Sequence, residues 1–488
     1  MDEFIHRLEQ RLTGEGKRLS IVRNPDGFLQ RPDTQQAVLN ACGLLLLPIS
    51  SSLELRVRYE LYDKNTRERI CYIMDDPSSV LPDIKRLLYN AHTFSIPDLM
   101  PACNEAEIRQ ARLTFGMASY IHNKKFVYNL SAVETKEVIE EAKKRYGEDI
   151  NELTTKLKSI PLKWEKVETM DSICHILLKA ISQGVYDKME SAVEIINEDF
   201  QQYIAEKYFA LSSSSHIVKP KTVNKILPHL AYKHNRTEKV ALVVIDGMTF
   251  WQYLILEQKL TGLGIKTKKD ATMAWIPSIT KLSRQAIFRG NIPQQDYGQT
   301  PIAEGRLWSE FWSNRYRGSK QMQPYEIAYT HDSLLTDDNV LYKQAFVDVS
   351  LDRKMHSSSS NKDLYDLTEN WAEEAAENIK LLHERGYIIY ITADHGNIMA
   401  HSWRSLNSQE RTFLYEKESR GSRHLIYSSA TYLDNFIQNN PEIHKELLVH
   451  NNWAVWKNSR CFKGKDEITH GGSHFLEVII PFVTIEKD

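Results

Sequence analysis

The 488-residue sequence lacks a long apolar run, has few cysteines and carries almost no excess charge. Its longest apolar stretch, residues 44–49, is far shorter than the roughly 20 residues that a membrane-spanning helix needs. The five cysteines form no Cys-x-x-Cys pair, which argues against a disulfide framework and a thiolate zinc site. With 62 Lys and Arg against 64 Asp and Glu, no global basic field exists for nucleic acid or a membrane surface. We therefore expect neither a membrane partner nor a strong non-specific nucleic-acid footprint.

The composition and the first residues bear on the class of protein. Hydrophobic residues make up 42% of the chain and aromatic residues 10%, which excludes a wholly disordered chain. The opening residues mix acids with apolar residues at helical spacing, whereas a secretory signal has a basic start and an uninterrupted apolar stretch. We therefore expect a folded, cytoplasmic protein.

Changes in residue pattern predict three regions. Residues 1–103 hold two expected strands, 19–22 and 69–74, and an alternating stretch at 53–61 that fits a strand by period although a helix is possible. Residues 104–215 repeat apolar positions at helical spacing and end in four serines. Residues 216–488 contain two continuous apolar runs, 240–245 and 387–392, which are typical of strands buried in a parallel sheet. The fold class is therefore α/β: a small α/β module, a helical connector, and a larger domain with a mostly parallel sheet between helices.

Both buried runs of the third region end in aspartate. Asp246 and Gly247 follow the first run, and Asp394, His395 and Gly396 follow the second. Ligands of open α/β sheets bind beyond the carboxyl ends of the strands, so these residues are candidates for a site. An Asp-Gly pair alone is a common turn, whereas Asp-His-Gly after a buried strand is rarer.

Two further short motifs carry metal-ligating residues. Asp352 and His356 are four residues apart, which places both side chains on one face of a helix. His470 begins a His-Gly-Gly sequence near the end of the chain. Alone, the first is usually a solvated helix surface and the second a turn. Taken together, the four motifs supply three aspartates and three histidines, a set suited to two divalent ions such as zinc or manganese.

Two such ions about 4 Å apart can hold the attacking and leaving oxygens of a displacement at phosphorus. The reaction also needs a nucleophile, and a hydroxyl beside a metal ion is acidic enough to serve near neutral pH. Residues 276–280, Ile-Pro-Ser-Ile-Thr, follow Asp246 by 30 positions and offer two hydroxyls.

The order of these motifs resembles the alkaline phosphatase superfamily, and within it the PglZ-domain proteins. The tail Thr-His-Gly-Gly at 469–472, followed by Glu-Val-Ile-Ile-Pro at 477–481, is similar to the PglZ pattern almost letter for letter. The resemblance spans about residues 239–486 and implies an alkaline-phosphatase-like catalytic domain.

The resemblance also implies roles for individual residues. It points to Thr280 as the nucleophile, with Thr249 and Ser278 as alternatives, of which Thr249 fits a helix cap better. The implied ligands form two sets, one of Asp352, His356 and His470, and one of Asp246, Asp394, His395 and the Thr280 oxygen. The implied cofactors are two divalent ions, zinc or else manganese. Candidate cations for the phosphoryl oxygens are Arg423, Lys281 and Arg284.

Two functions from different classes remain. The first is a metal-dependent phosphatase or phosphodiesterase whose substrate is a phosphate ester, with nucleotide or nucleic-acid diesters among the candidates. The resemblance places such an enzyme in a bacterial phage-defence system of the BREX type, beside an ATPase and a DNA methyltransferase. The second is a largely non-catalytic metal-binding scaffold that docks partner proteins of such a system. A phosphomutase is disfavoured because only 72 residues separate Thr280 from Asp352, too few for the inserted domain of those enzymes.

Overall fold

The computed structural model describes residues 3–487 apart from 15, 147–149, 295, 317–320, 335–341 and 416–420. The chain forms two compact units, Met1–Glu152 and Leu153–Asp488. The helical stretch 104–215 is divided between them, with α5, α6 and α7 in the first unit and α9 and α10 in the second. Each unit is described by itself below.

The first unit is built on a four-stranded parallel sheet in the order β2-β3-β1-β4. The strands expected at 19–22 and 69–74 are confirmed as β1 and β3. The strands and the larger helices are β1 Leu19–Arg23, β2 Leu44–Pro48, β3 Arg69–Ile73, β4 Leu88–Thr93, α1 Glu3–Leu12, α2 Pro32–Cys42, α3 Ser52–Arg58, α5 Glu105–Gln110, α6 Phe115–Asn123 and α7 Ala132–Tyr146.

The strand fitted by period to residues 53–61 is wrong, because this stretch is helical. It forms α3, which continues into a π-helical turn at Tyr59–Asp63. The Ser51 side chain accepts a hydrogen bond from the Glu54 amide and so caps the helix start. Leu55 is buried, whereas Leu53 and Val57 face solvent, so alternation in the sequence does not correspond to two sheet faces here.

The second unit contains a six-stranded sheet in the order β6-β16-β9-β5-β8-β7. Strands β9, β5, β8 and β7 are parallel neighbours, and β16 runs antiparallel to both β6 and β9. The runs at 240–245 and 387–392 are confirmed as β5 and β9, and every residue of both strands is buried. The six strands are β5 Val240–Ile245, β6 Lys268–Met273, β7 Ile327–His331, β8 Lys343–Asp348, β9 Ile388–Ala393 and β16 Ile479–Ile485.

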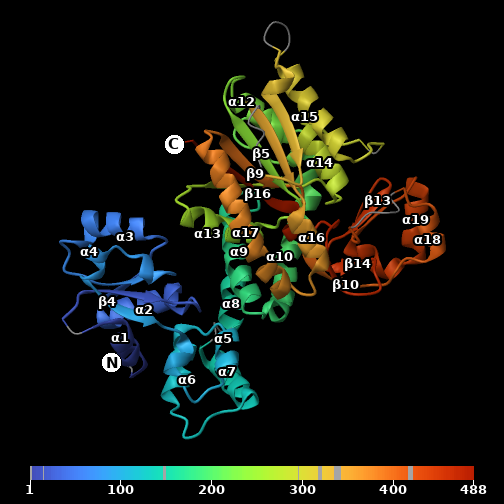
Figure 1. Ribbon diagram of the computed structural model, residues 1–488. Coiled ribbons are helices and arrows are strands. Elements are labelled where there is room, and N and C mark those ends of the chain that lie inside the picture. Colours follow the sequence, from blue (N-terminus) through green and yellow to red (C-terminus); the bar gives the residue numbers. More distant parts are fainter. Residues whose placement is uncertain are drawn as a thin grey trace. The chain divides into compact units, whose positions relative to one another are not determined.

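Helices cover both faces of this sheet, as the α/β interpretation predicts (Figure 1). Helices α9, α13 and α17 pack together on one face, and α12, α14 and α15 pack together on the other. A long α17 ends before Gly386, whose φ of 77° allows the chain to turn into β9. The helices are α9 Val167–Ser182, α10 Glu190–Tyr203, α12 Ile226–Lys233, α13 Phe250–Gly262, α14 Thr280–Arg289, α15 Pro301–Arg315, α16 Ser350–Ser357 and α17 Asn361–Glu384.

Two small three-stranded sheets follow β9, in the orders β14-β10-β15 and β11-β13-β12, and they precede the last strand of the main sheet. Their elements are β10 Ile398–Ser402, α18 Ser408–Thr412, β11 His424–Ile426, α19 Ala430–Asn439, β12 Leu447–His450, β13 Trp453–Trp456, β14 Arg460–Cys461 and β15 Glu467–Thr469. Among the described residues, no helix is both long enough and apolar enough to cross a bilayer.

Candidate metal and phosphoryl-transfer site

The register of the central sheet brings the predicted carboxylates together. Ile245, the last residue of β5, pairs with Ala393 on β9 and with Asp348 on β8. Asp246 and Asp394 therefore leave the sheet side by side, and α16, which carries Asp352, starts directly after β8. The candidate site lies at the carboxyl ends of adjacent parallel strands, where α/β sheets bind ligands.

The six predicted aspartates and histidines lie in two groups. In the inner group, Asp246, Asp394 and His395, all three residues are buried, and in the outer group, Asp352, His356 and His470, His356 is exposed. Within each group, one nitrogen or oxygen of every residue lies within 4.8 Å of those of the others. The rings of His395 and His470 stack with centroids 3.9 Å apart, so the two groups are neighbours. These are the two sets that the resemblance implied, although ion binding by them stays a prediction.

Backbone carbonyls orient the two buried histidines. His395 Nδ1 lies 2.9 Å from the Gly396 carbonyl, and His470 Nδ1 lies 3.0 Å from the Ser278 carbonyl. A carbonyl only accepts, so each Nδ1 donates and each Nε2 keeps its lone pair. In both groups, Nε2 is thus the atom available to a cation.

Thr280 is the first residue of α14, and its hydroxyl lies against the inner group. Its Oγ1 is 3.0 Å from His395 Nε2 and 3.5 Å from Asp246 Oδ1. The positive end of the helix macrodipole and the unpaired first-turn amides favour negative charge at this position. The geometry suits an oxygen that becomes anionic and that approaches a phosphoryl group.

The other two hydroxyls considered as nucleophiles have different contacts. Thr249 caps α13 by accepting a hydrogen bond from the Gln252 amide, as the sequence predicts. Ser278 is fully buried, and its hydroxyl contacts the backbone of Gly471 and Gly472. Thr280 is the one of the three whose hydroxyl contacts a metal-ligand candidate.

The three carboxyl groups differ in charge state. Burial, together with the neighbouring Asp394 carboxylate, raises the pKa of Asp246 to about 8, and burial raises the pKa of Asp394 to about 6. For Asp352, the hydrogen bond from His356 and the nearby His470 outweigh burial and lower the pKa to about 2. Near neutral pH, Asp246 therefore keeps its proton unless a metal ion replaces it, whereas Asp394 is mostly ionised.

The donor set fits divalent ions. Imidazole nitrogens and carboxylate oxygens without thiolates suit zinc or manganese. Asp394 Oδ2 is buried and accepts no hydrogen bond from any described residue. Its nearest cationic neighbour, the Arg284 guanidinium, is 3.8 Å away. A buried carboxylate oxygen without a hydrogen bond is costly, and a cation in the inner group would satisfy it.

The raised pKa of Asp246 predicts that the stability of metal-free protein depends on pH. In metal-free protein the folded state binds this proton more tightly than the unfolded state, so its contribution to stability is lost as pH rises from about 4 to about 8. We expect the melting temperature of chelator-treated wild type to fall more steeply over this range than that of Asp246→Asn, whose amide does not titrate. Parallel calorimetric profiles of the two proteins would contradict this.

Arg284 lies one helical turn after Thr280, but its guanidinium is already paired. It lies 3.3 Å from Asp246, 3.0 Å from Glu304 and 3.8 Å from Asp394, and it is 7% exposed. No sequence motif singles out Glu304, which is buried on α15 and accepts a 2.5 Å hydrogen bond from Tyr329. Arg284 therefore balances the charge of the inner-group carboxylates. Its Nε and Nη1 make no hydrogen bond to any described residue, and it lines the cavity beside the site.

The structure contradicts the prediction that Arg423 binds substrate. Arg423 is 0% exposed, its Nε donates to Glu477 at 3.0 Å, and its other nitrogens donate to the carbonyls of Arg460, Asn458 and Trp456. The sequence could not show this because the ion-pair partner is 54 positions away. Arg423 is a buried structural cation.

An open cavity of about 380 Å³ adjoins both groups. Lys281 lines it, as predicted, with its ammonium 5.5 Å from the centre of the Tyr415 ring. Four further polar residues on its wall were not predicted: Gln299, Thr300, His331 and Arg353. Arg353 lies inside the Asp352–His356 motif, and this position was the only sign in the sequence that it lines the cavity.

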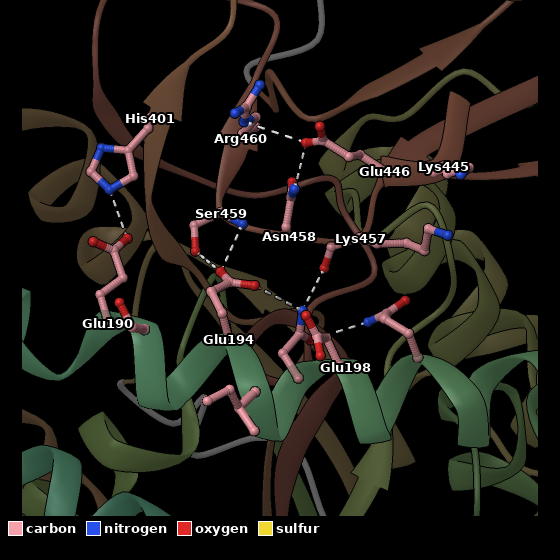
Figure 2. Close-up of a pocket in the computed structure, with 14 residues that line it drawn as sticks. Glu190, Glu194, Glu198, His401, Lys445, Glu446, Lys457, Asn458, Ser459 and Arg460 are labelled. Carbon is pink, nitrogen blue, oxygen red and sulfur yellow. Dashed lines mark hydrogen bonds and ion pairs between the residues drawn. The ribbon is translucent and has the colours of Figure 1, made fainter. Parts of the chain in front are cut away.

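A second, larger cavity of about 880 Å³ lies between α10 and the loop at 457–460 (Figure 2). It contains none of the predicted site residues. Figure 2 shows Glu190 and Glu194 of α10 reaching across to His401 and Ser459. These contacts join the helix to the small sheets of the second unit.

Comparison with models of protein families agrees with the family resemblance. The model for the BREX system PglZ alkaline phosphatase-like domain matches residues 224–485. No curated protein matches the sequence. Among solved structures, the chain is similar to murine ectonucleotide pyrophosphatase/phosphodiesterase 5, with 12% identity, a TM-score of 0.36, and coverage of 51% of this chain and 88% of the murine one. It is also similar to the phosphonoacetate hydrolase of Sinorhizobium meliloti, with 9% identity, a TM-score of 0.32, and coverage of 52% and 91%. Because the family match alone spans more than half of the sequence, this chain belongs to the PglZ alkaline phosphatase-like domain family.

Proposed function

We propose that this protein is a metal-dependent hydrolase of phosphoric esters that uses Thr280 as its nucleophile. The observation that carries the proposal is the contact of the Thr280 hydroxyl with His395 and Asp246 at the start of α14. Membership of an alkaline phosphatase-like family supports the same class of reaction. The cofactors in this proposal are two divalent ions, most simply zinc.

The two groups of aspartates and histidines would bind the ions, and Thr280 would react with the substrate. Asp246, Asp394 and His395 would hold one ion, and Asp352, His356 and His470 the other. When bound, the ions would supply the positive charge that makes a neighbouring hydroxyl acidic and that offsets charge on the phosphoryl group. Thr280 Oγ1 then attacks phosphorus, the ester oxygen leaves, and water later releases the phosphoryl group from Thr280. First-turn amides of α14 favour the anionic oxygens throughout.

The ion pairs of Arg284 favour a diester over a monoester. A monoester is a dianion near neutral pH and benefits from a guanidinium that is free to form two hydrogen bonds. Here the Arg284 guanidinium is shared among Asp246, Glu304 and Asp394. A singly charged diester needs less compensation, so we propose phosphodiesterase activity, with nucleotide or nucleic-acid diesters as substrates. The proposed setting is a BREX-type phage-defence system with an ATPase and a DNA methyltransferase as partners.

Removal of metal tests this function directly. We expect purified protein to contain about two divalent ions per chain and to hydrolyse an aryl phosphodiester faster than the matching aryl monoester. Dialysis against a chelator should abolish hydrolysis, and added zinc or manganese should restore it. Metal analysis and turnover of both esters provide the measurements, and a chelated protein with full activity would disprove the proposal.

A further inference from the structure

The loop that carries His470 is joined to the segment that carries Thr280 by a fully buried polar network. Ser278, two residues before Thr280, donates its hydroxyl to the Gly472 carbonyl at 2.9 Å and accepts from the Gly471 amide at 3.1 Å. Its own carbonyl accepts from His470 Nδ1 at 3.0 Å. One residue therefore contacts three consecutive residues of the loop.

A buried ion pair closes the network. Glu477 accepts from the Gly472 amide at 2.8 Å and from Arg423 Nε at 3.0 Å, and its Oε1 lies 3.4 Å from the Ser278 hydroxyl. Ser278, Glu477 and Arg423 are all 0% exposed. Arg423 is in turn fixed by backbone carbonyls of the 456–460 segment, so the Glu477 carboxylate has little freedom to move.

The two glycines of the loop permit this close packing. Gly471 has a φ of 110°, a conformation that L side chains rarely adopt. A Cβ at Gly472 would lie 2.7 Å from both Glu477 Oε2 and the Trp456 carbonyl. The backbone of the loop is thus held at one position, which determines where the His470 ring lies.

Helix α10 supports the far side of the same loop. Gln201 donates to the Ser473 carbonyl at 2.8 Å, and Asn197 donates to the Lys457 carbonyl, in the segment that holds Arg423, at 2.8 Å. The loop after His470 is therefore held by α10 on one side and by the Ser278 segment on the other.

We propose that Ser278 is a positioning residue, which acts with Glu477 and Arg423 to aim His470 Nε2 at Asp352 and His356. The proposal rests on the proposed function, because it assumes that the outer group binds an ion. Through Ser278, the position of this ligand is coupled to that of the nucleophile two residues later. Loss of the hydroxyl removes two hydrogen bonds to the Gly471-Gly472 backbone and changes none of the candidate ligand side chains.

Cobalt(II) titration of metal-free protein, followed by the visible absorption of the bound ion, tests the proposal without any turnover assay. We expect wild type to bind two ions and Ser278→Ala to bind one of them about 10- to 100-fold more weakly, with a changed spectrum. The matched control is Ser283→Ala. It removes another fully buried hydroxyl, on α14, which accepts from the Trp275 amide and does not contact the His470 loop. This control should bind both ions as wild type does.

Glu477→Gln is the second variant, because it keeps the shape of the side chain and removes its charge. We expect the same weakening of one ion. If Ser278→Ala and Glu477→Gln both bind cobalt as tightly as wild type, or if Ser283→Ala is weakened equally, the positioning role is wrong while the proposed function stands. If wild type itself binds no cobalt, the proposed metal site fails, and the positioning role fails with it.

Discussion

Replacement of Thr280 by alanine is expected to lower the turnover of an aryl phosphodiester by at least about 10³-fold, because it removes the attacking atom. The structure offers no second hydroxyl among the three candidates that can take its place. The Ser278 hydroxyl is hydrogen-bonded to the backbone of Gly471 and Gly472, and the Thr249 hydroxyl caps α13. The ion content should stay close to that of wild type, because all three inner-group side chains remain. Steady-state kinetics and metal analysis of the variant check both expectations.

Two control variants make this result specific. Thr280→Ser keeps a hydroxyl at the same position and should retain a large part of the activity. Thr249→Ala removes a buried threonine hydroxyl from a helix start in the same unit, which costs about 1 kcal/mol of stability but leaves the proposed chemistry unchanged. If Thr280→Ala hydrolyses the diester as fast as wild type, Thr280 is not the nucleophile.

The sequence predicts those site residues that directly follow the buried strands. The runs before Asp246 and Asp394 are continuous and β-branched, so they identify buried parallel strands, and the chain then has to leave the sheet at the carboxyl ends. The Asp352–His356 spacing indicates one helix face, and α16 confirms the helix. The family resemblance, confirmed by the family match, places all six candidate ligands in one domain.

The sequence does not predict partners that are brought together by tertiary packing. Glu304 reaches Arg284 only because α14 packs on α15, and neither residue lies in a motif that specifies the other. From the sequence, Arg423 fits a surface salt bridge slightly better than a phosphate-binding residue, and only the structure shows its burial against Glu477. Helix α3 shows the same limit within one short segment. Alternation of apolar and polar residues alone does not show whether a segment is a strand with one buried face or a helix.

Replacement of both Asp394 and His395 by alanine distinguishes the enzyme from the metal-binding scaffold. The double variant removes two of the three inner-group residues, so that ion should be lost. If the protein acts as an enzyme within the proposed BREX-type system, phage protection by that system should fall to the level of a strain that lacks the protein. If it acts only as a scaffold, protection should persist despite the loss of hydrolysis.

The matched control replaces another aspartate and histidine pair in the same unit. His401 Nδ1 lies 2.9 Å from Asp466, and His401 Nε2 lies 2.6 Å from Glu190 at the edge of the α10 cavity, outside both metal-ligand groups. Asp466→Ala with His401→Ala should keep the ions and the hydrolysis, because no candidate ligand changes. Plaque counts, measured at equal protein levels and with melting temperatures for both double variants, separate loss of chemistry from loss of folding. Full protection by the Asp394/His395 variant would show that the defence role does not need the inner ion, and the catalytic proposal for that role would then be wrong.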